Sequence, residues 1–242
     1  GEAYVFGEDN VLDISDWTTP YTLEYLTGIK VYNLGVAGET SNEIALRQGG
    51  IKMYADNTFE VGYDDSVEIS IIDEYGNPVY MADFSAYGYV EPHESDVVYI
   101  NDDMFKITGT EETGLYICRY SEEEDVYDAF TTVYEGTQIV TKAAHERKND
   151  ILILEIGSNG GWDNYRQLIS QYDAMIQNAG CDYFIIVGDT DDPGTSIADT
   201  AQGFRNDDGT YVGVGDTAWE ATLREAYGEH FINMRTYLIE NG

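Results

Sequence analysis

Hydrophobic and polar positions follow two different patterns along the chain, and the change between them divides the sequence. The first fifty residues and residues 150–242 combine short apolar runs with helix-length stretches that begin near Ser or Thr and end near Gly. Residues 51–149 instead alternate with a period of two, as in Val67–Ile71 and Tyr116–Tyr120. Alternation is typical of strands with one buried face, whereas apolar runs between helices are typical of buried parallel strands.

The outer segments predict strands and helices in alternation. Apolar runs predict strands at Ala3–Phe6, Ile29–Leu34, Ile151–Ile156, Tyr183–Val187 and Phe231–Met234. Capping residues and apolar spacing predict helices from Thr18 or Thr19 to Gly28, from Thr40 or Ser41 to Gly49, over Asp163–Ala179, over Thr217–Tyr227 and from Arg235 onward. In the first helix we expect the buried side to consist of Tyr21, Leu23, Tyr25 and Leu26.

This order of elements predicts an α/β fold of the flavodoxin-like kind, in which a parallel sheet lies between two layers of helices. We expect residues 1–50 and 150–242 to form this discontinuous domain, and residues 51–149 to form an inserted all-β, sandwich-like domain. Loops at the carboxyl ends of parallel strands form the sites of such folds. Here those loops are Gly7–Asp16, Gly35–Thr40, Gly157–Gly161 and Gly188–Thr195.

Two of these loops carry recognisable motifs. Residues Asn33–Ser41 place Gly38 after the second strand, and Ile156–Gly161 reads Ile-Gly-Ser-Asn-Gly-Gly with Asn159 after the third. The two blocks resemble those of the SGNH (GDSL-type) hydrolases over residues 1–50 and 150–242. The resemblance implies a flavodoxin-like fold and an acyl-transfer site, in which a Ser attacks and a Gly N–H and an Asn amide stabilise the oxyanion.

The chain departs from the family at the nucleophile. Where the family has Asp-Ser, this sequence has Glu8-Asp9, and no Asp-x-x-His block is found near the C-terminus. We therefore predict a non-catalytic protein with a relic site at Asp9, Gly38 and Asn159. The alternative is a secreted esterase that acts on acylated glycans through displaced catalytic groups. For His230, which precedes the last strand, we expect a structural role.

Charge narrows the set of partners. The chain has 46 acidic and 12 basic residues, a formal net charge of -34, and 13% aromatic residues, which indicates a folded domain with an acidic surface. Such a surface repels nucleic acid and anionic membranes, and no apolar run approaches the ~18 residues of a membrane span. We expect neither nucleic-acid binding nor membrane insertion; carbohydrate or other copies of the chain are the partners we consider.

Three further expectations follow from the residues. Asp189, Asp191 and Asp192 cluster after a predicted strand and are candidate calcium ligands, although Asp-rich loops are also common as plain turns. Cys118 and Cys181 fall in different predicted domains, which favours two buried free thiols over a bridge between them. The sequence starts at Gly1 as a processed secretory protein would, so we expect an extracellular or cell-surface protein that acts in binding, adhesion or assembly of a surface structure.

Overall fold

The structure, a computed structural model, describes residues 4–6, 12–14, 19–36, 38–62, 65–80, 96–121, 130–189 and 216–241. The chain divides into two compact units, each described by itself. The barrel unit comprises Gly1–Glu39 and Leu46–Glu146, and the sheet unit comprises Thr40–Ala45 and Arg147–Gly242. The domain boundaries predicted from the sequence stay a prediction. In the described residues, no helix is long and apolar enough to cross a membrane.

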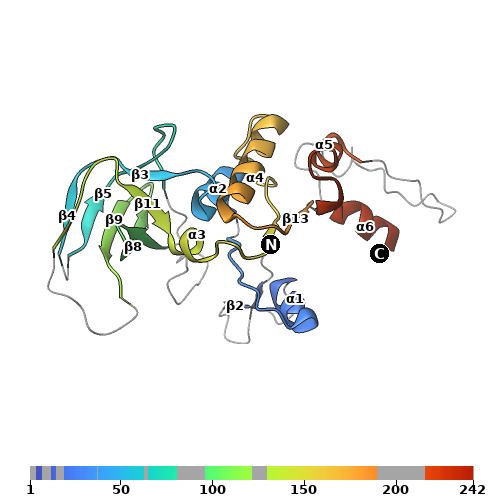
Figure 1. The fold of residues 1–242 in the computed structure, drawn as a ribbon, viewed down its shortest axis with the longest axis horizontal. Helices are drawn as coiled ribbons and strands as arrows, with labels where there is room; N and C mark the ends of the chain where they lie inside the picture. Colours follow the sequence, from blue (N-terminus) through green and yellow to red (C-terminus); the bar gives the residue numbers. More distant parts are fainter. Residues whose placement is uncertain are drawn as a thin grey trace. The chain divides into compact units, whose positions relative to one another are not determined.

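Seven antiparallel strands of the barrel unit form one nearly closed, barrel-like sheet (Figure 1). Its order is β5-β9-β8-β7-β11-β3-β6, and helix α3 (Lys142–Glu146) follows β11. The strands are β3 (Met53–Ala55), β5 (Val67–Ile69), β6 (Ile71–Asp73), β7 (Val97–Ile100), β8 (Asp103–Thr110), β9 (Gly114–Arg119) and β11 (Gln138–Thr141). Strand β4 (Phe59–Val61) pairs separately with β10 (Thr131–Val133).

The two end strands of the seven-stranded sheet are neighbours in the sequence. Strand β5 pairs with β9 at one end and β6 pairs with β3 at the other, and Ser70 is the single residue between them. The backbone of Ser70 is held on both sides: its N–H donates to Asn57 Oδ1 at 2.9 Å, and its carbonyl accepts from the N–H of Asp56 at 2.9 Å. One continuous segment therefore links both ends of the sheet.

The barrel core follows from the period-two pattern, because every second side chain of a strand faces inward. Its buried residues include Met53, Phe59, Val61, Ile69, Ile71, Val98, Ile100, Phe105, Ile107, Leu115, Ile117, Val133 and Ile139. In the β8–β9 hairpin, Gly109 has a φ of +102° and a Cβ added there would lie 2.0 Å from the carbonyl oxygen of Gly114. Only glycine fits this turn.

The described residues of the sheet unit form three parallel strands in sequential order, β12 (Leu152–Leu154), β13 (Phe184–Val187) and β14 (Phe231–Ile232). Helices α4 (Tyr165–Ala179) and α5 (Ala218–Tyr227) connect them. The 3₁₀ turn η2 (Gly228–His230) leads from α5 into β14, and α6 (Met234–Asn241) follows β14. Helix α2 (Ser41–Gln48) begins in this unit. One face of the sheet buries Leu154, Ile186 and Phe231 under residues that include Leu168, Tyr172, Met175, Leu223 and Tyr227.

Local signals set the limits of both connecting helices. The side chain of Asn164 caps α4 by accepting from the Gln167 N–H, and Gly180 ends the helix in the left-handed conformation at φ +63°. Thr217 and Glu220 form a capping box at the start of α5. Both helices lie where the sequence predicts them.

The prediction of a flavodoxin-like three-layer fold is wrong. Strand β1 (Tyr4–Phe6) pairs antiparallel with β2 (Leu12–Ile14), and the structure assigns no strand to residues 29–34. In place of an extended parallel sheet and a β-sandwich, the described residues hold three parallel strands and a larger antiparallel sheet that is barrel-like and not sandwich-like. One physical reason is local: the Val31 N–H donates to Glu24 Oε2 at 2.8 Å, so that amide does not enter a ladder.

Helix α1 (Thr19–Thr27) forms as predicted, but its expected buried side is wrong. The helix has no buried residue, and Tyr21, Tyr25 and Leu26 are 48%, 77% and 72% exposed. Cys118 and Cys181 are free thiols, as expected, but both are half-buried and not fully buried.

Candidate functional site

The loop after β12 lies at the carboxyl edge of the parallel sheet, where the sequence predicts a site. It turns at Gly157, whose φ is +109°, and its backbone is held by side chains. Trp162 Nε1 donates to the Gly157 carbonyl at 2.9 Å, and Gln171 Nε2 from α4 donates to the Gly161 carbonyl at 2.9 Å. The loop is therefore anchored to α4 at its far end.

The same loop packs closely against the start of α2. The Ser41 N–H donates to the Gly160 carbonyl at 3.0 Å. A Cβ added at Gly161 would lie 2.8 Å from Thr40 Cβ and 2.9 Å from the Ser41 nitrogen, so a larger residue would force the two segments apart. Glu43 caps this end of the helix by accepting from the Thr40 N–H at 2.8 Å. These contacts hold the start of α2 against the loop after β12.

Two side chains from different loops meet at this edge. The Ser158 hydroxyl donates a hydrogen bond to Asp189 Oδ2, which joins the loop after β12 to the second residue after the end of β13. Asn159 is the next residue and is exposed. The structure thus brings the Asn159 loop and Asp189 to the same edge of the sheet.

The other predicted site residues are not placed with them. Asp9, Asp191 and Asp192 lie outside the described residues. Gly38, exposed with a φ of +84°, belongs to the barrel unit, so its closeness to Asn159 stays a prediction. Across the part of the chain that is described, no three His, Cys, Asp or Glu residues are grouped to hold a metal ion.

Histidine is the group that acyl-transfer chemistry would need beside Ser158. His230 is the one histidine in the sequence of the sheet unit. Its Nδ1 lies 3.0 Å from the Phe184 carbonyl oxygen, and its ring stacks on the Phe184 ring with centroids 4.2 Å apart. Phe184 begins β13, and Asp189 lies five residues further on, about 16 Å along an extended chain. His230 therefore packs against the start of β13, and the structural role expected for it stays a prediction.

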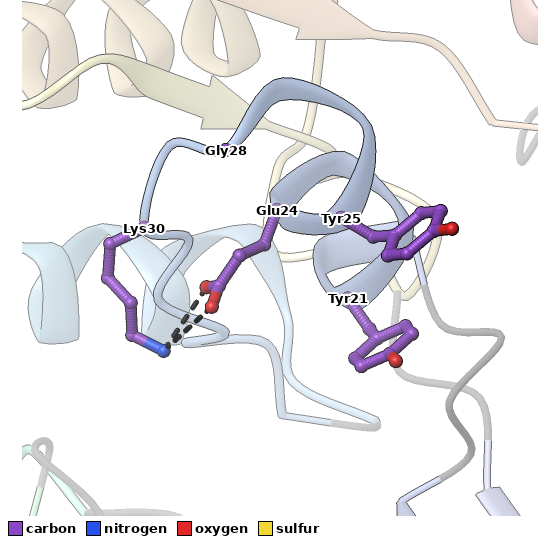
Figure 2. Close-up of a pocket in the computed structure, with 5 residues that line it drawn as sticks. All are labelled: Tyr21, Glu24, Tyr25, Gly28 and Lys30. Carbon is purple, nitrogen blue, oxygen red and sulfur yellow. Dashed lines mark hydrogen bonds and ion pairs between the residues drawn. The ribbon is translucent and has the colours of Figure 1, made fainter.

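A second candidate site is a shallow pocket of about 440 Å³ on α1 and the segment after it, in the barrel unit (Figure 2). It is lined by Tyr21, Glu24, Tyr25, Gly28 and Lys30. Figure 2 shows both tyrosine rings projecting from the same side of α1, and the Glu24 carboxylate directed at the Lys30 ammonium. The pocket thus combines two exposed aromatic rings with a charged pair.

The charged pair also fixes the wall of the pocket. Lys30 Nζ lies 3.1 Å from Glu24 Oε2, and the same oxygen accepts the Val31 N–H at 2.8 Å. These hydrogen bonds, from the Val31 amide first and then from Lys30, hold the pKa of Glu24 below its ordinary value. Glu24 is therefore an acceptor at neutral pH, and Lys30 is a donor beside it.

Sequence reasoning missed this pocket because it treated the aromatic residues of the helix as core. Tyr21 and Tyr25 are four residues apart and so lie on one helical face, which is the spacing of a buried stripe. The signal that could have found the pocket is Glu24 between them with Lys30 six residues later, a polar pair where a buried face would be apolar.

Comparisons of the chain with protein family models, with curated proteins and with solved structures give no match.

Proposed function

We propose that this chain is a non-catalytic, extracellular carbohydrate-binding protein that takes neutral oligosaccharides at the α1 pocket. The observation that carries the proposal is the pair of exposed tyrosines, Tyr21 at 48% and Tyr25 at 77% exposure, in a pocket that Glu24 and Lys30 also line. Exposed aromatic rings on one helical face are costly to leave in water, so their presence favours a ligand that covers them.

The pocket has the mixture of groups that a sugar ring requires. A pyranose ring presents C–H groups on its faces and hydroxyl groups at its rim, and tyrosine rings offer an apolar face together with a polar hydroxyl. Glu24 accepts hydrogen bonds and Lys30 donates them, which matches the rim hydroxyls. A few placed polar groups in an otherwise apolar pocket set the orientation of a ligand.

Net charge selects among sugars. A chain with a formal charge of -34 repels anionic ligands over roughly the Debye length, about 8 Å at physiological ionic strength. Uronic acids and sulfated glycans therefore meet an unfavourable field as they approach, whereas neutral glycans do not. The proposal is restricted to neutral oligosaccharides for this reason.

Two observations support the absence of catalysis. The nucleophile position of the resembling hydrolases holds Asp9 in this sequence, and a carboxylate does not supply the hydroxyl that their chemistry uses. His230, the histidine of the sheet unit, is bonded at the amino end of β13 and not at the edge that carries Ser158. A serine without an adjacent base is a poor nucleophile.

The test is affinity electrophoresis and isothermal titration with a panel of neutral probes: cello-, xylo-, manno- and chito-oligosaccharides. We expect at least one probe to bind, and Tyr25→Ala to weaken it by about tenfold, the loss of one stacked ring. Tyr25→Phe, which keeps the ring, retains most of the affinity. Tyr75→Ala is the matched control, because Tyr75 is 73% exposed in the turn after β6, outside the pocket.

Two results would contradict the proposal. Failure of every probe to bind removes the carbohydrate function, and equal weakening by Tyr75→Ala and Tyr25→Ala removes the pocket. A serine-reactive phosphonate probe tests the other half of the proposal: covalent labelling of any serine would mean that the chain has a working nucleophile after all.

A further inference from the structure

The segment that follows α1 is held by side chains of that helix as far as Val31, the residue before Tyr32. Thr27 Oγ1, at the end of the helix, accepts the Ile29 N–H at 3.2 Å. Glu24 Oε2 accepts the Val31 N–H at 2.8 Å. Both bonds tie the backbone of the segment to α1, so the chain that leads to Tyr32 has a fixed course beside the helix.

The side chain of Lys30 contacts both the α1 pocket and Tyr32. Its Nζ lies 3.1 Å from Glu24 Oε2 in the lining of the pocket, and the same ammonium lies 5.9 Å from the centroid of the Tyr32 ring. The second distance is within the range of a cation–π interaction. The Lys30 side chain is 66% exposed, and an ammonium group carries three N–H donors. Lys30 therefore presents a hydrogen-bond donor to a ligand at the point where the pocket meets Tyr32.

Tyr32 adds a third exposed aromatic ring to the two rings of the pocket. It is 44% exposed, close to the 48% of Tyr21. Tyr21 and Tyr25 are one helical turn apart, about 6 Å along the axis, whereas Tyr32 lies outside the pocket lining and against Lys30. A sugar ring stacks on an aromatic ring of similar size. Three rings on two segments therefore suit consecutive sugars of one chain better than a single monosaccharide.

We infer that the binding site continues past Lys30 to Tyr32, and that its ligand is a linear run of neutral sugars with Tyr32 as the binding residue of a second subsite. Lys30 donates to a hydroxyl of the sugar between the two subsites. The inference rests on the carbohydrate function proposed above and adds the length of the ligand: oligosaccharides that reach Tyr32 bind more tightly than disaccharides. In the alternative, Tyr32 only positions Lys30, and ligands of every length then depend on it equally.

The experiment titrates the full chain with cello-, xylo-, manno- and chito-oligosaccharides, each as a series from disaccharide to hexasaccharide. In a series that binds, we expect the hexasaccharide to bind about tenfold more tightly than the disaccharide, the gain from one more stacked ring. Tyr32→Ala removes most of this gain and leaves the affinity for the disaccharide unchanged, whereas Tyr25→Ala weakens both ligands. Tyr80→Ala is the matched control and affects neither, because Tyr80 is 40% exposed and lies outside the pocket lining.

Tyr32→Leu keeps an apolar side chain and removes the aromatic face, so it repeats the test if the alanine variant folds poorly. Equal weakening of the disaccharide and the hexasaccharide by either variant overturns the second subsite, since Tyr32 then acts only through Lys30. Equal affinities of the parent chain for the two ligands overturn it as well. Both results leave the carbohydrate function standing, whereas failure of every probe to bind removes that function and the inference together.

Discussion

The guanidinium of Arg235 lies against the carboxylate of Glu220 as a buried, two-pronged ion pair that joins α6 to α5. Arg235 Nε donates to one carboxylate oxygen and Arg235 Nη2 to the other, and both side chains are more than nine-tenths buried. The second oxygen also accepts the Thr217 N–H at 2.8 Å in the capping box. One carboxylate thus closes a helix end and holds the next helix.

Arg235→Met removes the charge and keeps most of the side-chain volume. The carboxylate of Glu220 is then buried without its partner, which costs about 3–5 kcal/mol of folding free energy. Urea denaturation measures the loss. Arg224→Met is the control. In the Arg224–Asp216 ion pair the Arg224 side chain is 48% exposed, and exposed ion pairs contribute about 1 kcal/mol or less to stability. Similar losses in the two variants would mean that burial does not decide the effect.

Acid should destabilise the sheet unit through two carboxylates. Burial alone would raise the pKa of Glu220, but hydrogen bonds from Arg235 and from the Thr217 N–H outweigh it, and the pKa is lowered from 4.5. The hydrogen bonds from Arg224 lower the pKa of Asp216 below 3.8. A carboxyl group whose pKa is lower in the folded than in the unfolded state stabilises the fold at pH values above its unfolded-state pKa. This stability is lost as the pH falls through the folded-state pKa. We expect the melting temperature to fall from about pH 4.5 downward.

The matching comparison is the Arg235→Met variant measured over the same pH range. It loses the main group that lowers the pKa of Glu220, so its melting temperature should fall less steeply with acid than that of the parent chain. Parallel melting curves against pH in both proteins would show that other carboxylates set the acid limit.

Tyr172→Phe tests the joint between α4 and the end of β12. The hydroxyl of the fully buried Tyr172 donates to the Ile156 carbonyl at 3.0 Å, and burial raises the pKa of this phenol. The phenylalanine variant leaves that carbonyl without its donor and should lose about 1–3 kcal/mol in chemical denaturation. Tyr183→Phe, at a residue that is 70% exposed, should change stability by less than about 0.5 kcal/mol. An unchanged free energy of unfolding in Tyr172→Phe would show that this hydrogen bond does not help to hold α4 to the end of β12.

Alanine variants at two glycines of the barrel unit can distinguish the cost of backbone strain from the cost of a steric clash. Gly136 has a φ of +81° with open space where a Cβ would lie, whereas a Cβ at Gly109 would meet the Gly114 carbonyl at 2.0 Å. Gly136→Ala should cost about 1–3 kcal/mol from the left-handed backbone alone. Gly109→Ala should cost about 2 kcal/mol more, because the hairpin must open to admit the methyl group. Thermal unfolding of both variants compares the two costs; equal costs would show that the hairpin yields freely.

The sequence predicts well those elements whose limits are set by neighbouring residues. Helix α4 lies where its cap Asn164 and its terminal Gly180 place it, and β12 and β13 lie within the apolar runs 151–156 and 183–187. The alternating residues of the central segment also form strands. Their order around the barrel was not predictable, because β5 pairs with β9 and β11 with β3 across long stretches of chain.

The wrong predictions share a cause: the pattern within a segment does not specify what packs against it. Residues 29–34 are apolar enough for a strand, but their composition cannot show whether a partner strand exists. In the structure, Glu24 accepts a hydrogen bond from one of their backbone amides instead. The Tyr21 and Tyr25 spacing has the period of a buried helical face, yet nothing in it specifies what would cover that face. Of the predicted site, Asn159 and Asp189 share an edge because both follow adjacent parallel strands, which is a rule of topology and was predictable.

The continuity of β5 and β6 through Ser70 has a consequence for how the barrel comes apart. In an open sheet the two outermost strands fray independently, each at its own small free-energy cost. Here the outermost strands are one piece of chain, and Ser70 is tied to Asp56 and Asn57 by its carbonyl and amide. Separation of β6 from β3 therefore disturbs β5 where it pairs with β9, so neither end strand of the sheet can detach without affecting the other. The barrel should melt as a single cooperative body.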